Sequence, residues 1–576
     1  MKFKRIFAAG IVIAGISPAF AQDNIGTEVV NVVKPYTPTI SDAFKVKETP
    51  VIEDEENSKK ADIKYNIFSF PVASTFTPSK GRAAGVEKEP KETLYQNYAT
   101  LAGGNYTTIN GELFLTTEVG SNGYIGGMVR HFSSGGGIDE VRLEDGFHNS
   151  SIDITYGNRS DTFSWTADVG YQNQGYNWYG LPEGFLDGLD EEATRELLAS
   201  VDPSHTYHNA SVGGSVIAHE SFFDEVQLRY NRFWDSDDSE ENRFYIKPKF
   251  TFDIADTSIK TNFIVDHVSG SFRAASFLSE TESYGFTNFG VHPSFNIVRD
   301  DWSINVGAAA FYSMASEGGD SKFFIYPMVN ASYKLVGDLM IFYAGAEGGL
   351  EQNSYRDFTN ENPFLMPGVF VAPTDRQYDV FAGLKGKLAN RVSYNVRGSF
   401  VSEDNKALFH INDYYNVFSE DYEFGNSFGV VYDRVTTLSF FGELRAEFSK
   451  NVSFGVNGTF NSYSTDDQAE AWNLPTLRLG ASLDVDITKK WYAGADVFFV
   501  GERKDRQDNL DDVIEPEITT LDPFVDLNAH VGYKHNERLT GFLKVNNIIG
   551  ENYERWMNYP VQGIQVLLGA SYKFNF

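Results

Sequence analysis

The sequence predicts an all-β fold: a transmembrane antiparallel β-barrel of about 22 strands, with short periplasmic turns and long extracellular loops. From about residue 95 onward, segments of alternating apolar and polar residues come in pairs joined by very short polar turns. The connections on the opposite side of these pairs are longer and uneven. The last segment, which ends at Phe576, is apolar on one face and polar on the other. This combination is typical of a sheet that closes on itself within a lipid bilayer.

The composition fits such a fold and excludes several classes of function. Aromatic residues make up 15% of the 576 residues, and the 51 glycines suit strands and tight turns. The chain has no cysteine, which excludes disulfide scaffolds, thiolate metal sites and cysteine nucleophiles. Its net charge of −31 argues against nucleic acid as a partner. We interpret this charge as a solvated surface, with a cation-collecting surface as the alternative.

The N-terminal region differs from the rest of the chain. Residues 1–21 have a basic start, a short apolar run and the small-x-small sequence Ala19-Phe20-Ala21, which together predict a cleaved signal peptide. Residues 22–95 contain six of the 19 prolines and a charge run at 53–60, and we interpret them as an extended periplasmic or lumenal arm. No later apolar stretch has the length of a membrane-spanning helix. The chain is therefore expected to be exported, either as a soluble protein or as a barrel over residues 96–576.

Ten short turns set the number of strands. Each combines Gly, Asn, Asp, Ser, Lys or Arg between β-rich runs, as hairpin turns do. They lie at Ser121–Gly123, Asn158–Asp161, His219–Asp224, Ala255–Ser258, Arg299–Asp301, Val336–Asp338, Ala389–Arg391, Ser449–Asn451, Thr488–Lys490 and Asn536–Arg538. Ten hairpins give twenty strands, and an opening and a closing strand give 22. The spacing between turns is irregular, which disfavours a soluble β-propeller.

The alternation within strands predicts which side chains face the lumen. In 392–400 the polar face includes Arg397, and in 525–533 it includes Asp526, Asn528 and His530. The apolar residues between them are expected to face lipid, because successive side chains of a strand point to opposite sides of the sheet.

The closing strand carries a signal of its own. Tyr572, Phe574 and Phe576 share the apolar face. A terminal aromatic strand of this kind is expected to be recognised by the β-barrel assembly machinery. Trp556, Tyr559 and Tyr553, just before this strand, are interpreted as interfacial girdle aromatics.

The long connections at 173–206, 351–374, 403–424 and 502–520 are the predicted extracellular loops. The first should hold a helix capped by Asp190, with Leu189, Ala193, Leu197 and Val201 on one face. This helix either packs on its neighbours or forms a docking surface for an extracellular partner. The acidic run at 502–517, including Asp505, is interpreted as a solvated loop, with calcium binding as the alternative.

The C-terminal region resembles the end of a TonB-dependent receptor barrel. The similar features are Val545-Asn546-Asn547-Ile548, then Tyr559-Pro560 and Gly563, followed by the aromatic last strand. Glu361-Asn362-Pro363-Phe364 and the opening segment Gly104-Asn105-Tyr106 are also similar. The resemblance covers about residues 95–576. It implies an outer-membrane location in a diderm bacterium, with outer-membrane lipid and lipopolysaccharide around the barrel.

The chain departs from these receptors at its N-terminal end. Residues 22–95 are too few for the folded plug domain that such receptors carry ahead of the barrel. The run Glu28, Val29, Val30, Asn31, Val32 and Val33 resembles a TonB box but is equally an ordinary β-prone hexamer, so engagement of TonB stays open. Because a lumen of about 22 strands is normally plugged, we expect the arm and inward-folded loops to fill it.

No sequence motif indicates catalysis, a cofactor or a metal site. The scattered histidines are interpreted as polar lining residues, and the chain is not expected to be an enzyme. Two functions remain. One is a non-enzymatic subunit of an outer-membrane complex, with a surface lipoprotein or another complex member as partner. The other is solute uptake through the barrel, gated by the short arm.

Overall fold

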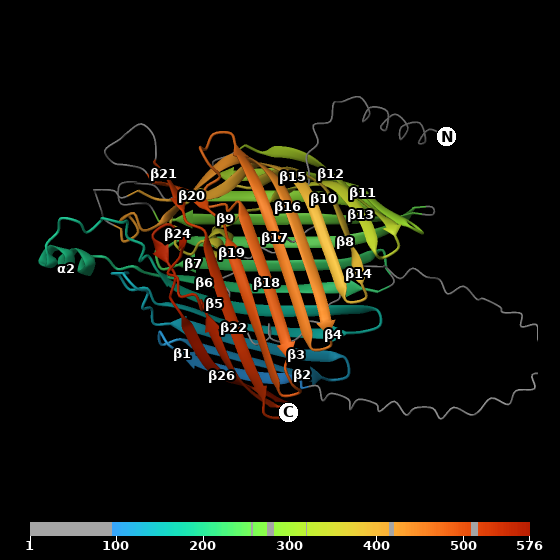
Figure 1. Cartoon of the computed structure of the whole chain (residues 1–576). Helices are drawn as coiled ribbons and strands as arrows, with labels where there is room; N and C mark the ends of the chain where they lie inside the picture. Colours follow the sequence, from blue (N-terminus) through green and yellow to red (C-terminus); the bar gives the residue numbers. More distant parts are fainter. Residues whose placement is uncertain are drawn as a thin grey trace, which may run out of the picture. The chain divides into compact units, whose positions relative to one another are not determined.

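The computed structural model of the chain describes residues 95–219, 221–254, 257–273, 282–317, 320–413, 420–507 and 517–576. The predicted signal peptide, nearly all of the arm, and the TonB-box-like residues Glu28, Val29, Val30, Val32 and Val33 lie outside these ranges. The described chain is built mainly from antiparallel strands that run side by side around a barrel wall (Figure 1). The all-β barrel prediction is therefore confirmed.

Twenty-two strands form one continuous sheet. They are β1 (Asn97–Gly104), β2 (Ile109–Val119), β3 (Gly123–Ser134), β4 (Phe147–Arg159), β5 (Phe163–Asn177), β6 (Ser204–Ala218), β7 (Phe223–Asp235), β8 (Glu240–Ile254), β9 (Thr257–Phe272), β10 (Glu282–Arg299), β11 (Trp302–Glu317), β12 (Lys322–Val336), β13 (Met340–Glu351), β14 (Thr374–Ala389), β15 (Val392–Ile411), β16 (Phe428–Ser449), β17 (Val452–Thr465), β18 (Leu477–Asp486), β19 (Trp491–Val500), β22 (Phe524–Lys534), β23 (Leu539–Asn546) and β26 (Gln565–Phe574). Each strand pairs with its neighbour in this order.

The sheet closes because the first strand pairs with the last. β1 and β26 are antiparallel from Asn97 opposite Phe574 to Gly104 opposite Leu567. A closed sheet leaves no row of unpaired backbone groups facing lipid. The eight predicted turns whose residues are all described lie at one end of the strands, where they join consecutive pairs such as β2–β3 and β16–β17. Glu220, Ala255 and Asp256, of the other two turns, lie outside the described residues.

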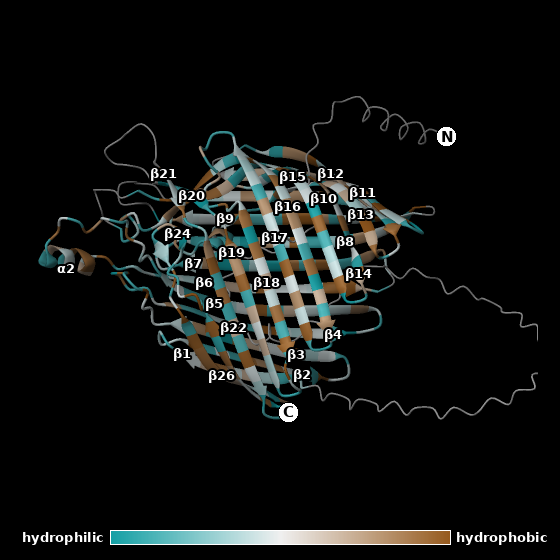
Figure 2. Ribbon diagram, in the orientation of Figure 1, coloured by the Kyte–Doolittle hydropathy of each residue, from teal (hydrophilic) through white to brown (hydrophobic). Residues whose placement is uncertain are grey.

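The two faces of the wall differ as the alternation predicts. In β26, Val566, Leu568 and Tyr572 are exposed on the outer face, whereas Gln565, Leu567 and Ser571 are buried on the inner face. Figure 2 shows the same banding of hydrophobic and hydrophilic residues along many strands. The predicted closing-strand aromatics Tyr572 and Phe574 stack on this outer face, with ring centroids 6.1 Å apart.

Inward-facing aromatic rings lie over glycines of adjacent strands. A Cβ atom on Gly532 of β22 would come within 2.1 Å of the Tyr492 ring on β19. Tyr343 on β13 covers Gly383 on β14 in the same way. Glycine is needed at these positions because the neighbouring ring occupies the space of its side chain. These contacts fix the tyrosine rings against the inner wall.

The long connections build a second layer of structure at the other end of the barrel. It contains the helices α2 (Glu191–Ser200) and α3 (Tyr355–Glu361) and two small hairpins, β20 (Arg503–Gln507) with β21 (Glu517–Leu521) and β24 (Glu554–Trp556) with β25 (Tyr559–Pro560). In Figure 1, α2 projects beyond the strand ends at the same end of the barrel as β20, β21 and β24. Among the described residues, no helix is both long and apolar enough to cross a membrane.

Candidate functional site

The loop between β13 and β14, residues 352–373, folds inward across the barrel mouth. Its helix α3 begins after Ser354, whose hydroxyl accepts a hydrogen bond from the Asp357 backbone N–H at 3.1 Å. Such a cap fixes the start of a short helix that would otherwise leave its first N–H groups unpaired. Tyr355 and Phe358 on this helix are buried. The helix therefore belongs to a packed interior and is not a free surface loop.

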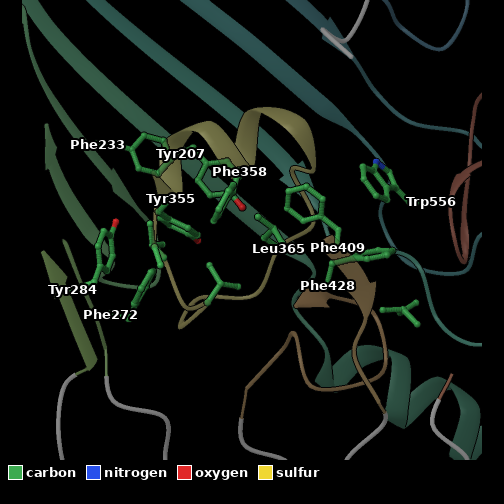
Figure 3. Close-up of a cluster of buried hydrophobic side chains, with 14 of the residues drawn as sticks. Tyr207, Phe233, Phe272, Tyr284, Tyr355, Phe358, Leu365, Phe409, Phe428 and Trp556 are labelled. Carbon is green, nitrogen blue, oxygen red and sulfur yellow. The ribbon is translucent and has the colours of Figure 1, made fainter. Parts of the chain in front are cut away.

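A set of buried side chains, here called the mouth cluster, holds this loop in place (Figure 3). Its members come from the strands β6, β7, β9 and β10, from β15 and β16, and from the loops. They include Tyr207, Phe233, Phe272, Tyr284, Tyr355, Phe358, Leu365, Phe409, Phe428, Trp556 and Tyr559. Tyr355, Leu365 and Phe428 are all 0% exposed. The cluster thus joins two separate parts of the barrel wall through α3 and the residues that follow it.

Polar groups anchor α3 to the wall. The Tyr355 backbone N–H donates to Glu241 Oε2 at 2.6 Å, and its hydroxyl donates to Asp235 Oδ2 at 3.0 Å. The Tyr284 hydroxyl also donates to Glu241 Oε2, at 2.5 Å. Because an unpaired buried carboxylate is costly, these bonds make the inward position of α3 a specific one.

The C-terminal part of the loop is also held in place by hydrogen bonds. The Met366 backbone N–H donates to the Phe428 carbonyl at 2.9 Å, and Phe428 N–H donates to the Phe364 carbonyl at 3.0 Å. The Tyr432 hydroxyl accepts from Ala372 N–H at 2.9 Å and donates to the Phe370 carbonyl at 3.0 Å. The loop therefore joins β16 by backbone pairing and cannot move without breaking several bonds together.

The girdle interpretation of Trp556, Tyr559 and Tyr553 is wrong. Trp556 and Tyr559 are 6% and 1% exposed, inside the mouth cluster. The Tyr559 ring stacks on Phe364 at 3.8 Å between centroids. Tyr553 stacks on Phe524 at 3.9 Å and donates to Asp526 Oδ2 at 3.2 Å. The hairpin before the last strand folds inward, so these aromatic rings pack on loops and wall.

The helix expected in the 173–206 loop is confirmed as α2. Asp190 caps it by accepting hydrogen bonds from the backbone N–H groups of Glu192 and Ala193. Leu197 and Val201 pack with Leu143 and Phe424 of other loops, but Leu189 is 42% exposed and lies outside this contact. The expected apolar stripe is therefore only partly formed.

Asp505 is buried, which corrects the interpretation of its segment as a solvated loop. Its carboxylate accepts hydrogen bonds from Ile411 N–H at 3.1 Å and from Asn473 Nδ2 at 2.8 Å. These bonds hold β20 against the C-terminal end of β15. Burial raises the pKa of Asp505 to about 7, against the hydrogen bonds that favour its charged form. The remaining acidic residues of the run, Asp508, Asp511 and Asp512, lie outside the described residues.

Docking of the β20–β21 hairpin should depend on pH. Because the folded pKa of Asp505 is raised from 3.8 to about 7, the docked state binds a proton that the undocked state lacks between these values. Docking is therefore expected to be strongest below about pH 4, to weaken as pH rises from there to about 7, and to change little above that. Hydrogen exchange of residues 503–507, corrected for intrinsic rates, should be faster at pH 8 than at pH 6. Asp505→Asn should lose this difference, and a difference that persists would contradict the assignment.

The four residues predicted to face the lumen lie on two separate strands and do not form one site. Arg397 on β15 pairs with Asp379 and lies 3.9 Å from the Phe381 ring centroid. On β22, Asp526 accepts from Tyr553, Asn528 Oδ1 accepts from Asn547 N–H at 3.0 Å, and His530 lies over Gly494. These three residues share one wall segment, whereas Arg397 lies on another.

A polar cavity of about 470 Å³ lies against the inner wall beside α3. Its lining includes Arg130, Arg229, Arg243 and Arg356 together with Asp153 and Glu241. Arg229 pairs with Asp168, and Arg243 pairs with Asp266 and Asp357, so much of this positive charge is compensated. This cavity was not predicted from the sequence, although the alternation places these strand residues on the lumen face. Within the described ranges, no group of three or more His, Asp or Glu side chains is arranged to hold a metal ion.

Comparisons with known proteins identify the class of the fold. No family model and no curated protein matches the sequence. The structure of the ferripyoverdine receptor of the outer membrane of Pseudomonas aeruginosa matches with a TM-score of 0.61 at 13% identity, over 84% of this chain and 72% of that chain. The ferric-catecholate import receptor Fiu from Escherichia coli K12 matches with a TM-score of 0.61 at 11% identity, over 84% and 82%.

The FrpB iron transporter from Neisseria meningitidis, in its F5-1 variant, matches with a TM-score of 0.63 at 11% identity, over 84% of this chain and 83% of that chain. At these identities the likeness concerns the fold. The chain has the outer-membrane-type 22-stranded barrel of TonB-dependent receptors. The resemblance read from the C-terminal sequence is confirmed at this level.

Proposed function

We propose that the protein is an integral outer-membrane barrel that acts with partner proteins as a non-enzymatic subunit of an outer-membrane complex. The observation that supports this role is the mouth cluster. A barrel that worked as a passive pore would need an open mouth, whereas here the loop at 352–373 is packed between two parts of the wall. The helix α2 and the hairpins β20–β21 and β24–β25 then present a folded surface at the extracellular end of the barrel.

Solute uptake is the second candidate. The solved structures with the same fold include an import receptor and an iron transporter. The polar cavity beside α3 also offers charged and amide groups to a ligand inside the lumen. In this alternative the segment 22–95 is the gate, and TonB is an open question.

Conductance in planar bilayers separates these functions. For the complex subunit we expect the intact purified chain to show little steady conductance and to retain a stoichiometric companion in gentle detergent. A lone protein with large, steady conductance would contradict this proposal. Deleting residues 23–90 should raise conductance if the arm is a gate. Unchanged conductance after this deletion would exclude the arm as the occluding element.

A further inference from the structure

The polar cavity beside α3 lies against six neighbouring strands, β3 to β8. Its lining forms two aligned rows, because these strands pair in register. The row nearer the mouth is Arg130, Ser151, Gln172 and Asn209. The row nearer the short turns is Asp153, Gly170, Ser211, Asn231 and Arg243. Helix α3 meets the β8 end of these rows, where Asp357 pairs with Arg243 and Arg356 joins the lining.

Two charged groups of opposite sign stay unpaired at the β3–β4 end of the cavity. Among the described residues, neither Arg130 nor Asp153 has a hydrogen-bond or ion-pair partner. Both are exposed, and they alternate with Val129 and Ile152 on the outer face. The guanidinium and the carboxylate are therefore available to a molecule inside the cavity.

Two further groups of the lining are buried without a partner. Asn209 is 9% exposed, and its Oδ1 accepts no hydrogen bond within the described chain. Arg356 Nε is also buried and donates to no described group, and the Nη1 of this residue lies 3.6 Å from Asp357 Oδ1. Buried polar atoms normally have partners. A free acceptor on the wall and a free donor on α3 indicate a ligand that both donates and accepts.

The chemistry of the lining matches a short peptide. The cavity of about 470 Å³ lies within the range of ligand pockets, about 300–1,000 Å³. Side-chain amides and hydroxyls both donate and accept, as peptide groups do, and here they are supplied by Ser151, Gln172, Asn209, Ser211 and Asn231. Strands lie about 4.8 Å apart and an extended residue spans about 3.3–3.6 Å. A few residues therefore reach from Asp153 on β4 to Arg356 at the β8 end.

We propose that this cavity binds a short peptide in its zwitterionic form. The Asp153 carboxylate accepts from the terminal ammonium group, and Arg356 Nε donates to the terminal carboxylate. Asn209 Oδ1 accepts from a peptide N–H, and Arg130 donates to a peptide carbonyl. The inference rests on the solute-uptake candidate of the proposed function and names its ligand class, whereas binding itself is measured without transport.

The test is equilibrium dialysis of radiolabelled trialanine against the full chain in mild detergent. N-acetyl-trialanine and trialanine amide should each bind about tenfold more weakly than trialanine, because each lacks one charge-assisted contact. Asp153→Asn should weaken trialanine binding about tenfold and no longer distinguish the acetylated peptide, while it still distinguishes the amide. Arg356→Gln should show the reverse pattern.

The matched control is Asp484→Asn on β18. Asp484 is likewise an exposed strand carboxylate but does not line the cavity, so this variant should bind all three peptides as the original chain does. Heat-modifiable migration in gels verifies that each variant forms the barrel. Equal binding of trialanine and its blocked forms would overturn the proposal, as would equal weakening by Asp153→Asn and Asp484→Asn.

An uncharged ligand and the conductance separate the remaining outcomes. Maltotriose can pair with amides and hydroxyls but has no terminal charges, so maltotriose binding as tight as that of trialanine would overturn the peptide assignment. Conductance without trialanine binding would overturn this site alone. Trialanine binding in the expected pattern by a chain without conductance would support the site and contradict uptake.

Discussion

Replacing Tyr355 with alanine should open the barrel mouth. The substitution removes a fully buried ring that contacts Phe272 at 5.0 Å and Phe233 at 5.6 Å between centroids, and it removes the hydroxyl that donates to Asp235 Oδ2. Removing a large buried aromatic side chain costs about 3–5 kcal/mol. At about 1.4 kcal/mol per decade, the population with α3 displaced should rise a hundredfold or more. Planar-bilayer conductance, recorded for the full chain and for the deletion of residues 23–90, is the direct readout.

Two variants calibrate this result. Phe370→Ala lies in the same loop but removes a ring that is 56% exposed, so its conductance should stay close to that of the original chain. Tyr355→Phe keeps the ring and the backbone bond to Glu241 and loses only the bond to Asp235, which is worth about 1 kcal/mol. If Tyr355→Ala conducted no more than Phe370→Ala in both backgrounds, the loop would not be the element that closes the mouth.

Placing an arginine on the lipid face of β18 should strongly destabilise the barrel. Leu483 is 40% exposed on the outer face, well inside the apolar belt. An arginine on the lipid face near the bilayer midplane costs about 2–4 kcal/mol. Leu483→Arg is therefore expected to lower the free energy of unfolding by that amount in lipid vesicles titrated with denaturant.

The adjacent position supplies the matched control. Ser482 faces the lumen, in register with Asp496 of β19. Ser482→Arg places the same cation beside a carboxylate in a polar interior, so its effect on unfolding should be within about 1 kcal/mol. Similar destabilisation by both variants would mean that the two faces of this strand do not meet lipid and water as assigned.

The barrel wall could be predicted from the sequence because its determinants are local. Turn residues and the two-residue alternation of a strand can both be recognised within a dozen positions, so the turns at Ser121–Gly123 and Ser449–Asn451 are identified directly. Closure itself follows from the number of strands and from the need to satisfy every backbone group in lipid.

The mouth could not be predicted because its contacts join distant segments. The sequence just before the last strand would contain the same aromatic residues whether their side chains faced lipid or packed inward. Tyr559 is inward because Phe364 and Phe428, far away in the sequence, pack against it. In the sequence, Asp505 resembles a surface carboxylate, because its hydrogen-bond partners Ile411 and Asn473 belong to other segments of the chain. The capping pair Ser354 and Asp357 was the one local signal that could have indicated α3.

The pairing of β1 with β26 has a kinetic consequence. The two edges that meet, such as Thr100 beside Ser571, are separated by nearly the whole described chain. Contacts between such distant segments form slowly, since the entropy of bringing the ends together is lost before any bond is gained. Until the final residues arrive, every intermediate keeps two unpaired strand edges. The unfolded polypeptide must therefore be protected from aggregation until its last strand pairs with its first and the cylinder shuts.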